Sequence, residues 1–335
     1  MRERAFAAAG PDGAPLRLAY TDWGDVANPR ALVCVHGLTR NARDFDALAA
    51  ALSPDHRVIC ADVVGRGGSD WLGDPAGYAY PTYIAHLRAL LAHLGLARVD
   101  FVGASMGGLI GMMLAAGEDS PVARLVMNDI GPFIPGAALA RIGDYVGADP
   151  RFADVDALEA YLRSIYPGFG PMTDAQWRAF AGHSARALPG GGVALAYDPA
   201  IGLAFKDAPV EDVDLWPLWD AVRCPVLVLR GAQSDVLPAA TAAEMATRGP
   251  RARIVEFAGV GHTPALMDDA QIAIVRDWLA SASGERRRDR EVERARDRRG
   301  GGDGDQPGGD DGAQVRAPHQ LPALPVHHRG FGRFG

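Results

Sequence analysis

A serine in a tight glycine-flanked turn is the first candidate for chemistry in this chain. Ser105 stands in the stretch Gly103-Ala104-Ser105-Met106-Gly107, between an apolar strand-like run and a helix-forming run. A strand that turns straight into a helix strains the backbone of its central residue, so the residues two positions away must be small; here both are glycine. Such a turn raises the hydroxyl at the edge of the sheet and points the helix N-terminus at it. Ser105 is therefore the candidate nucleophile.

A serine hydroxyl is a weak nucleophile until a neighbouring base removes its proton. The chain has nine histidines, and His262 is the best placed of them. It lies in AGVGHTPALMDD, a glycine-flanked loop that follows the last predicted strand and precedes a helix. This position returns the imidazole to the carboxyl edge of the sheet, within reach of Ser105.

The imidazole works best when a carboxylate fixes its tautomer and stabilises its charged form. Two aspartates leave the carboxyl end of a predicted strand: Asp235, in GAQSDVLP after VLVLRG, and Asp129, in NDIGP after RLVM. We favour Asp235, because its strand directly neighbours in chain order the strand that leads to His262. Asp129 is the alternative acid, and it could instead cap the turn into the next segment.

An attacked carbonyl also needs donors for its developing oxyanion. The motif His36-Gly37, in VCVHGLTRN, ends an early strand and would let the Leu38 amide point at the site. The Met106 amide, directly after the nucleophile, would be the second donor. The imidazole of His36 is expected to brace this loop, which is compatible with the role of the amide.

Short apolar runs and amphipathic runs alternate along the chain, which predicts an α/β fold with a mostly parallel sheet covered by helices on both faces. The predicted strands lie at residues 31–37, 57–65, 99–105, 124–131, 225–231 and 253–262. Apolar residues recur at helical spacing near residues 45–52, 84–94 and 272–279. Functional groups in such sheets gather at the carboxyl ends of the strands.

Residues 132–218 break this rhythm and predict an all-helical lid inserted into a core formed by residues 1–131 and 219–283. The aromatic residues of the lid are expected either to line an acyl or aromatic pocket or to form the lid's own small core: Phe133, Tyr145, Tyr161, Tyr166, Phe169, Trp177 and Phe180.

From residue 284 onward mixed charge, Gly and Pro dominate, which predicts a disordered low-complexity tail over residues 284–335. The abrupt change in composition at this point also suggests that the tail is coding sequence read out of frame. His327 and His328 in this tail are a weak metal site without further ligands.

The composition of the chain argues against several classes of binding partner. The net charge of -7 argues against nucleic acid and anionic membranes, and no apolar run is long enough to span a bilayer. The three cysteines, Cys34, Cys60 and Cys224, are far apart and predict free thiols in a reducing cytoplasm. The N-terminal apolar run is too short for a signal peptide. We therefore expect a cytoplasmic protein with a small-molecule acyl substrate, no metal and no cofactor, and a homodimer remains open.

Together these motifs resemble the α/β-hydrolase superfamily in its serine-nucleophile branch with a helical lid. The resemblance runs from about Leu16 to Ala282 and rests on His36-Gly37, DVVGRGGSD, GASMGG, GAQSD and GVGHTP. It implies about eight strands, with LRLAYTDWGDVANPRALVCVHG similar to the opening strands of the family, and the chain order serine, acid, histidine. A serine at this turn argues against the epoxide-hydrolase and haloalkane-dehalogenase branches, which use aspartate there. The loop residues Asp62, Arg66, Ser69 and Asp70 are expected to hold DVVGRGGSD in place rather than to react.

The resemblance implies an esterase-like hydrolase that works through an acyl-enzyme intermediate. Lactonase, thioesterase and carbon–carbon bond hydrolase activities on the same three residues stay open. For the last of these, Arg40, Asn41, Arg141 and Arg178 are candidates to bind a carboxylate. A ligand receptor that retains the three residues is an alternative of another class.

Overall fold

The computed structural model describes residues 1–206 and 211–281. Among these residues, a first compact unit covers Met1–Val275, and a second unit begins at Arg276. The predicted tail at residues 284–335, with His327 and His328, lies outside the described residues.

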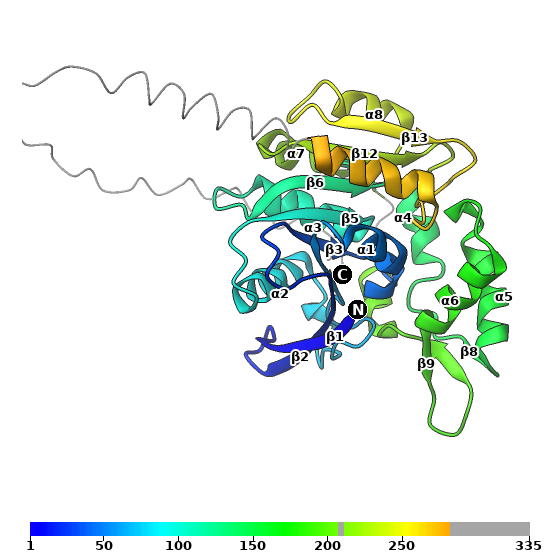
Figure 1. Ribbon diagram of the computed structural model, residues 1–335. Helices are drawn as coiled ribbons and strands as arrows, with labels where there is room; N and C mark the ends of the chain where they lie inside the picture. The colour runs from blue at the N-terminus through cyan, green and yellow to red at the C-terminus, as the bar shows by residue number, and fades with distance from the viewer. Residues whose placement is uncertain (207–210, 282–335) are drawn as a thin grey trace, which may run out of the picture. The chain divides into compact units, whose positions relative to one another are not determined.

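The first unit is built on one eight-stranded sheet with the order β1-β2-β4-β3-β5-β6-β12-β13 (Figure 1). Its strands are β1 (Arg2–Ala9), β2 (Pro15–Trp23), β3 (Ala31–Val35), β4 (Arg57–Ala61), β5 (Val99–Ala104), β6 (Val122–Asn128), β12 (Val226–Gly231) and β13 (Arg253–Phe257). The pairs β1–β2 and β2–β4 are antiparallel, and every later pair is parallel. Each predicted strand is present, although five of the six end between one and five residues earlier than predicted.

The burial of the central strands indicates that both faces of the sheet are covered by helices. Every residue of β3, β4, β6 and β12 is buried, which requires packing on both faces of the sheet. The flanking helices are α1 (Asp46–Leu52), α2 (Tyr80–His93), α3 (Met106–Ala116), α7 (Trp216–Ala221) and α8 (Ala239–Met245), and a last helix starts at residue 269. Helix α3 packs against β5 and β6, and α1 packs against β4. The predicted fold class is confirmed.

The segment between β6 and α7 carries most of the remaining structure. Its helices are α4 (Gly136–Gly143), α5 (Val155–Ile165) and α6 (Asp174–Ser184), with short 3-10 helices at Pro167–Phe169 and Pro199–Ala204. Its short strands are β7 (Phe133–Ile134), β8 (Arg151–Phe152), β9 (Ala185–Ala187), β10 (Val193–Leu195) and β11 (Val213–Asp214).

The prediction that this segment is entirely helical is therefore wrong. Strands β8, β10 and β9 form a three-stranded sheet, and β11 pairs with β7. The cause lies in LPGGG: Gly190, Gly191 and Gly192 have φ angles of 94°, 102° and 78°, which reverse the chain between β9 and β10. The division between core and lid at residues 132 and 218 stays a prediction.

Across residues 1–206 and 211–281, no helix is both long enough and apolar enough to cross a membrane.

Candidate active site

Ser105 lies in the tight turn that the glycine spacing predicts. It follows β5 directly and precedes α3, and its backbone angles are φ 49° and ψ -116°, a region that a side chain adopts only under strain. A Cβ atom on Gly103 would lie 2.2 Å from the carbonyl oxygen of Gly107. A Cβ atom on Gly107 would lie 2.0 Å from the carbonyl oxygen of Val35. Only glycine fits at both positions, so the turn and the sheet edge are packed backbone against backbone.

The hydroxyl of Ser105 meets the imidazole of His262. Ser105 Oγ lies 2.9 Å from Nε2, and on the other side of the ring Nδ1 lies 2.7 Å from Asp129 Oδ2. An ionised carboxylate can only accept, so the proton belongs on Nδ1, and Nε2 is left to accept from the serine. The three side chains thus form one continuous hydrogen-bonded chain.

Asp129 is held in place by more than His262. Its side chain is fully buried, the amide of Gly231 donates to Oδ1 at 2.8 Å, and the hydroxyl of Ser234 donates to Oδ2 at 2.5 Å. Its φ angle of 58° is one that aspartate tolerates better than most residues. These donors fix the direction of the carboxylate toward the imidazole.

Asp129, and not Asp235, is hydrogen-bonded to His262 Nδ1, so the prediction that Asp235 orients the imidazole is wrong. The Asp235 carboxylate instead accepts two hydrogen bonds from Arg141 of α4, at 2.6 Å from Nε and 3.0 Å from Nη2. Partial burial raises the pKa of Asp235, but Arg141 outweighs this effect and holds the pKa below its ordinary value. The side chain is 47% exposed, which makes this a surface ion pair.

The reason for the difference is the course of the chain after two neighbouring strands. β6 and β12 pair in parallel, so Asp129 and Asp235 both leave the same sheet edge. After β12 the chain turns so that Ser234 faces Asp129, and the next residue then points toward α4. The residue Ser234 was missed in the sequence, because nothing in GAQSD distinguishes a serine that supports an acid from a turn residue.

The His36-Gly37 loop lies beside the nucleophile. A Cβ atom on Gly37 would lie 3.7 Å from Ser105 Cβ. His36 is fully buried, accepts from the amide of Val63 at Nε2 (3.0 Å) and donates from Nδ1 to its neighbour's carbonyl oxygen (2.7 Å). Burial lowers the pKa of His36 to about 3, so the ring stays neutral and braces the loop as predicted.

The two expected oxyanion donors are both in a position to be free. Met106 is the first residue of α3, and the first N–H groups of a helix have no partner within it. No backbone carbonyl oxygen of the described residues accepts a hydrogen bond from the Leu38 amide. The carbonyl oxygen of Leu38 is fixed by Arg66 Nε at 2.8 Å.

The DVVGRGGSD loop holds itself together as predicted. Asp62 accepts from the amides of Ala42 (2.7 Å) and Gly68 (2.9 Å). The hydroxyl of Ser69 donates to the carbonyl oxygen of Asp62, and Asp70 Oδ2 accepts from the backbone of β2. Burial raises the pKa of Asp62 to about 6.

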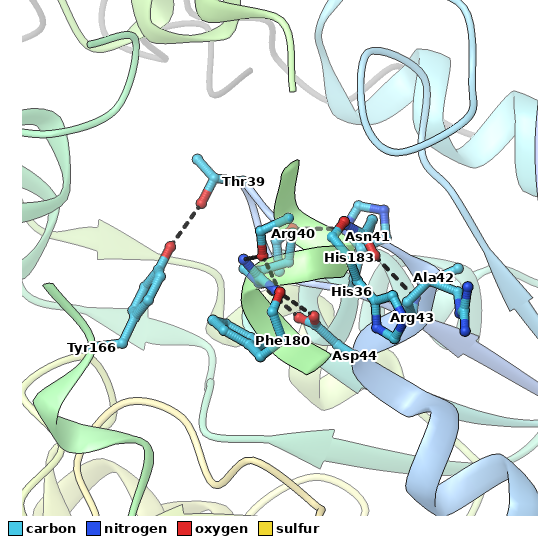
Figure 2. Close-up of polar contacts among 12 residues, drawn as sticks. His36, Thr39, Arg40, Asn41, Ala42, Arg43, Asp44, Tyr166, Phe180 and His183 are labelled. Atoms are coloured by element: carbon cyan, nitrogen blue, oxygen red, sulfur yellow. Dashed lines mark hydrogen bonds and ion pairs between the residues drawn. The ribbon is translucent and has the colours of Figure 1, made fainter. Parts of the chain in front are cut away.

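Three consecutive residues after the His36-Gly37 loop reach the segment between β6 and α7 (Figure 2). The contacts are Thr39 Oγ1 to the Tyr166 hydroxyl (3.1 Å), Arg40 Nη1 to Ser184 Oγ (2.8 Å) and Asn41 Nδ2 to the His183 carbonyl oxygen (2.8 Å). In a further contact, the amide of Gly261 donates to the carbonyl oxygen of Gly168 at 2.7 Å. The segment is thus tied both to the loop beside Ser105 and to the loop that carries His262.

The aromatic residues of this segment serve in part as its own core. Tyr166 stacks on Phe169 with centroids 4.6 Å apart, and Phe180 meets the edges or faces of Phe169 and Trp177 at 5.5 and 5.8 Å. Phe169 and Phe180 also line a pocket next to Ser105. Both expected roles therefore occur, and two residues combine them.

A resident metal has no evident ligand set here. Within residues 1–206 and 211–281, no group of three or more His, Cys, Asp or Glu side chains is arranged to hold a metal ion.

This strand order, with a serine at the strand-to-helix turn, a histidine after the last strand and a buried acid, defines an α/β-hydrolase. The chain belongs to this family: residues 30–269 match the family described as alpha/beta hydrolase fold. The predicted class, a hydrolase, is confirmed.

Among known proteins, the chain is 46% identical over 274 residues to the 3-hydroxybutyrate-oligomer hydrolase of Cupriavidus necator, a match that covers 79% of this chain and 94% of that protein. It is 30% identical over 228 residues to the 2-(acetamidomethylene)succinate hydrolase of Mesorhizobium japonicum, covering 68% and 79%. Among solved structures, an alpha/beta hydrolase from Novosphingobium aromaticivorans has a TM-score of 0.74 and 38% identity, covering 83% of this chain and 98% of that one.

Proposed function

We propose that this chain is a serine esterase that cleaves short oligomers of 3-hydroxybutyrate through an acyl-enzyme intermediate. The observation that carries the proposal is the continuous hydrogen-bonded chain Ser105–His262–Asp129, whose two distances are 2.9 and 2.7 Å. The substrate class is supported by the 46% identity to the Cupriavidus necator oligomer hydrolase over nearly its whole length. Units of 3-hydroxybutyrate are joined by ester bonds, which this kind of site attacks.

In the first half of the reaction, His262 Nε2 takes the proton of Ser105 as Oγ attacks the ester carbonyl carbon. The negative charge on the carbonyl oxygen is bound by the amides of Leu38 and Met106, which form the oxyanion hole. The charged imidazole is stabilised by Asp129 and then gives its proton to the leaving alcohol oxygen. The carbon–oxygen bond of the ester breaks, and the acyl group remains on Ser105.

In the second half, a water molecule takes the place of the alcohol. His262 removes one proton from the water as its oxygen attacks the acyl carbon. The intermediate collapses, the proton returns to Ser105 Oγ, and the free acid leaves. In this proposal residues 132–218 act as a cap that limits which acyl and alcohol groups reach the serine.

We also propose a cytoplasmic location. Cys34, Cys60 and Cys224 are free thiols, and Cys34 and Cys60 lie opposite each other on neighbouring strands without forming a bond. This fits a reducing compartment. Fractionation of cells that express a tagged chain tests the proposal, and enrichment outside the cytoplasm would overturn it.

The decisive experiment is to incubate the purified chain with the dimer and trimer of 3-hydroxybutyrate and to quantify the released monomer by chromatography. Ser105→Ala is the inactive comparison, and Ser53→Ala, at a partly exposed serine whose hydroxyl bonds only to its own helix turn, is the matched control. We expect monomer release by the wild type and by Ser53→Ala, with a loss of about 10⁴-fold or more in Ser105→Ala. Undiminished release by Ser105→Ala would refute the mechanism.

The same preparation separates the other candidate functions. A simple ester, a lactone, a thioester and 2-(acetamidomethylene)succinate are offered at equal concentration, because a relative at 30% identity is a hydrolase of the last compound. A kcat/KM for any of them well above that for the trimer would reassign the substrate. Binding without turnover of every compound would favour a ligand receptor.

A further inference from the structure

A small pocket lies next to the turn that carries the nucleophile: the preceding residue, Ala104, lines it, although Ser105 itself does not. Its walls come from the loop beside Ser105, the ends of β5 and β6, the loop after His262 and the aromatic residues of the cap. They are Gly37, Arg40, Asp44, Phe45, Ala104, Asn128, Phe169, Phe180, Thr263, Pro264, Ala265, Leu266 and Met267. Its volume of about 40 Å³ is enough for roughly three or four non-hydrogen atoms, since one water needs about 10–15 Å³ on this scale.

The charged residues of this pocket neutralise each other. Arg40 donates from Nε (2.9 Å) and Nη2 (2.6 Å) to the two oxygens of Asp44, and its guanidinium lies 3.7 Å from the ring centre of Phe180 (Figure 2). Burial would lower the pKa of Arg40, but the Asp44 carboxylate raises it above its ordinary value. A cation that already has a bidentate carboxylate does not call for a second one, so the pocket suits an uncharged group.

One buried polar atom of a residue that lines the pocket lacks a partner. Asn128 is 2% exposed, and its Nδ2 donates to the carbonyl oxygen of Pro264 at 2.8 Å. That bond fixes the orientation of the amide, because a carbonyl oxygen can only accept. None of the described residues donates to Asn128 Oδ1. A buried acceptor of this kind is usually satisfied, so the pocket is complementary to a ligand with one hydrogen-bond donor.

Asn128 is rigidly placed with respect to the reacting atoms. Its carbonyl oxygen accepts from the amide of Ser105 at 3.0 Å, and the next residue in the chain is Asp129. A group held by Asn128 Oδ1 is therefore positioned by the same backbone that positions the nucleophile and the acid.

We propose that this pocket holds the acyl group of the substrate and that Asn128 Oδ1 accepts a hydrogen bond from a hydroxyl on the third carbon of that group. The inference rests on the proposed esterase function and specifies its acyl side. Beyond its carbonyl group, a 3-hydroxybutyryl unit has four non-hydrogen atoms and one hydroxyl donor, which matches the volume and the unpaired acceptor. Since only the unit at the hydroxyl end of an oligomer has a free 3-hydroxyl, the enzyme removes one unit at a time from that end.

The first test compares two p-nitrophenyl esters of nearly equal shape, 3-hydroxybutyrate and 3-methylbutyrate, in which a methyl group replaces the hydroxyl. We expect the wild type to have a kcat/KM at least about tenfold higher for the hydroxy ester, because the analogue leaves Asn128 Oδ1 unpaired. In Asn128→Ala the ratio should fall to within about threefold of one. Any general loss from the missing bond to Pro264 affects both esters and cancels in the ratio.

The matched control is Ser184→Ala, which removes a partner of Arg40 behind the pocket but leaves Asn128 intact. It should keep the preference of the wild type. A wild-type ratio near one, or a full preference retained in Asn128→Ala, overturns the inference while leaving the esterase function in place. Turnover of neither ester by the wild type would instead refute the esterase function.

A second test needs no variant. The trimer of 3-hydroxybutyrate is compared with the same trimer acetylated at its hydroxyl end, which has no free hydroxyl and a bulkier terminal unit. We expect monomer release from the acetylated trimer to be at least about tenfold slower. Equal rates for the two trimers would overturn cleavage from the hydroxyl end.

Discussion

Asp129 Oδ2 lies 2.7 Å from His262 Nδ1, although 133 residues separate the two in the chain. The carboxylate is fully buried and accepts from two further donors, whereas the side chain of Asp235 is 47% exposed. The acid that supports the imidazole is thus the one that follows β6, and the acid that follows β12 belongs to a surface ion pair.

A comparison of the two acids tests this relationship directly. We expect Asp129→Asn to lower kcat for p-nitrophenyl butyrate by about 10⁴-fold, because an amide supports the wrong tautomer and cannot stabilise the imidazolium. Asp235→Asn should change kcat by less than about fivefold, since its partner is an exposed arginine. Urea unfolding of both variants checks that they are folded. A larger loss of kcat in Asp235→Asn would contradict the assignment.

Ser234 is expected to position Asp129. Its hydroxyl donates to Oδ2 at 2.5 Å, so Ser234→Ala leaves a buried carboxylate with one donor fewer. We expect kcat to fall about tenfold while KM changes little, since a hydrogen bond to a charged group is worth about 1.5–3 kcal/mol. The pH profile of kcat should shift as well, which a merely structural serine would not cause. An unchanged profile and an unchanged kcat would rule out this role.

The buried imidazole of His36 should make the protein sensitive to acid. Burial lowers the pKa of His36 to about 3, below its unfolded value of about 6.5. The stability that the neutral ring contributes is therefore present above pH 6.5 and is lost as the pH falls toward 3. Between pH 6.5 and 5 the wild type should lose up to about 2 kcal/mol in its free energy of unfolding.

The measurement is urea unfolding at pH 7.5, 6.5 and 5 in the wild type and in His36→Gln, which does not titrate. Only the slopes with pH are compared, because the substitution itself lowers stability at every pH. We expect a flatter slope in the variant. Parallel slopes would assign the acid sensitivity to other groups.

The glycine after the nucleophile should not tolerate a methyl group. In Gly107→Ala the new Cβ would lie 2.0 Å from the carbonyl oxygen of Val35, which cannot move without disturbing β3. We expect a loss of about 3 kcal/mol or more in the free energy of unfolding. Gly182→Ala in α6 is the control: nothing lies within 4 Å of its new Cβ, and it should be neutral or slightly stabilising. A Gly107→Ala variant as stable as this control would contradict the packing described for the turn.

Much of the site could be predicted because it depends on local geometry. The spacing Gly103–Ser105–Gly107 predicts a tight turn without any knowledge of distant residues, and the structure shows that both glycines are required there. The place of His262 after the last strand likewise follows from the rule that parallel strands present their carboxyl ends at one edge. The family and the hydrolase class follow from these same motifs.

Other features could not be predicted because they depend on the path of loops in space. LPGGG reads as a turn, but only the pairing of β10 with β9 and with β8 shows that it closes a hairpin in this segment. The free oxygen of Asn128 is likewise invisible in the sequence, where the residue is one polar position at the end of a buried strand.

The sequence alone determined the nucleophile, its base and the edge of the sheet at which they meet, because these follow from strand order and turn chemistry. It could not decide between Asp129 and Asp235, since two neighbouring parallel strands deliver both acids to that edge. The tertiary structure decided, because Ser234 and Gly231 turn their donors toward Asp129 and α4 places Arg141 against Asp235. Which carboxylate is buried beside the imidazole is set by these long-range contacts.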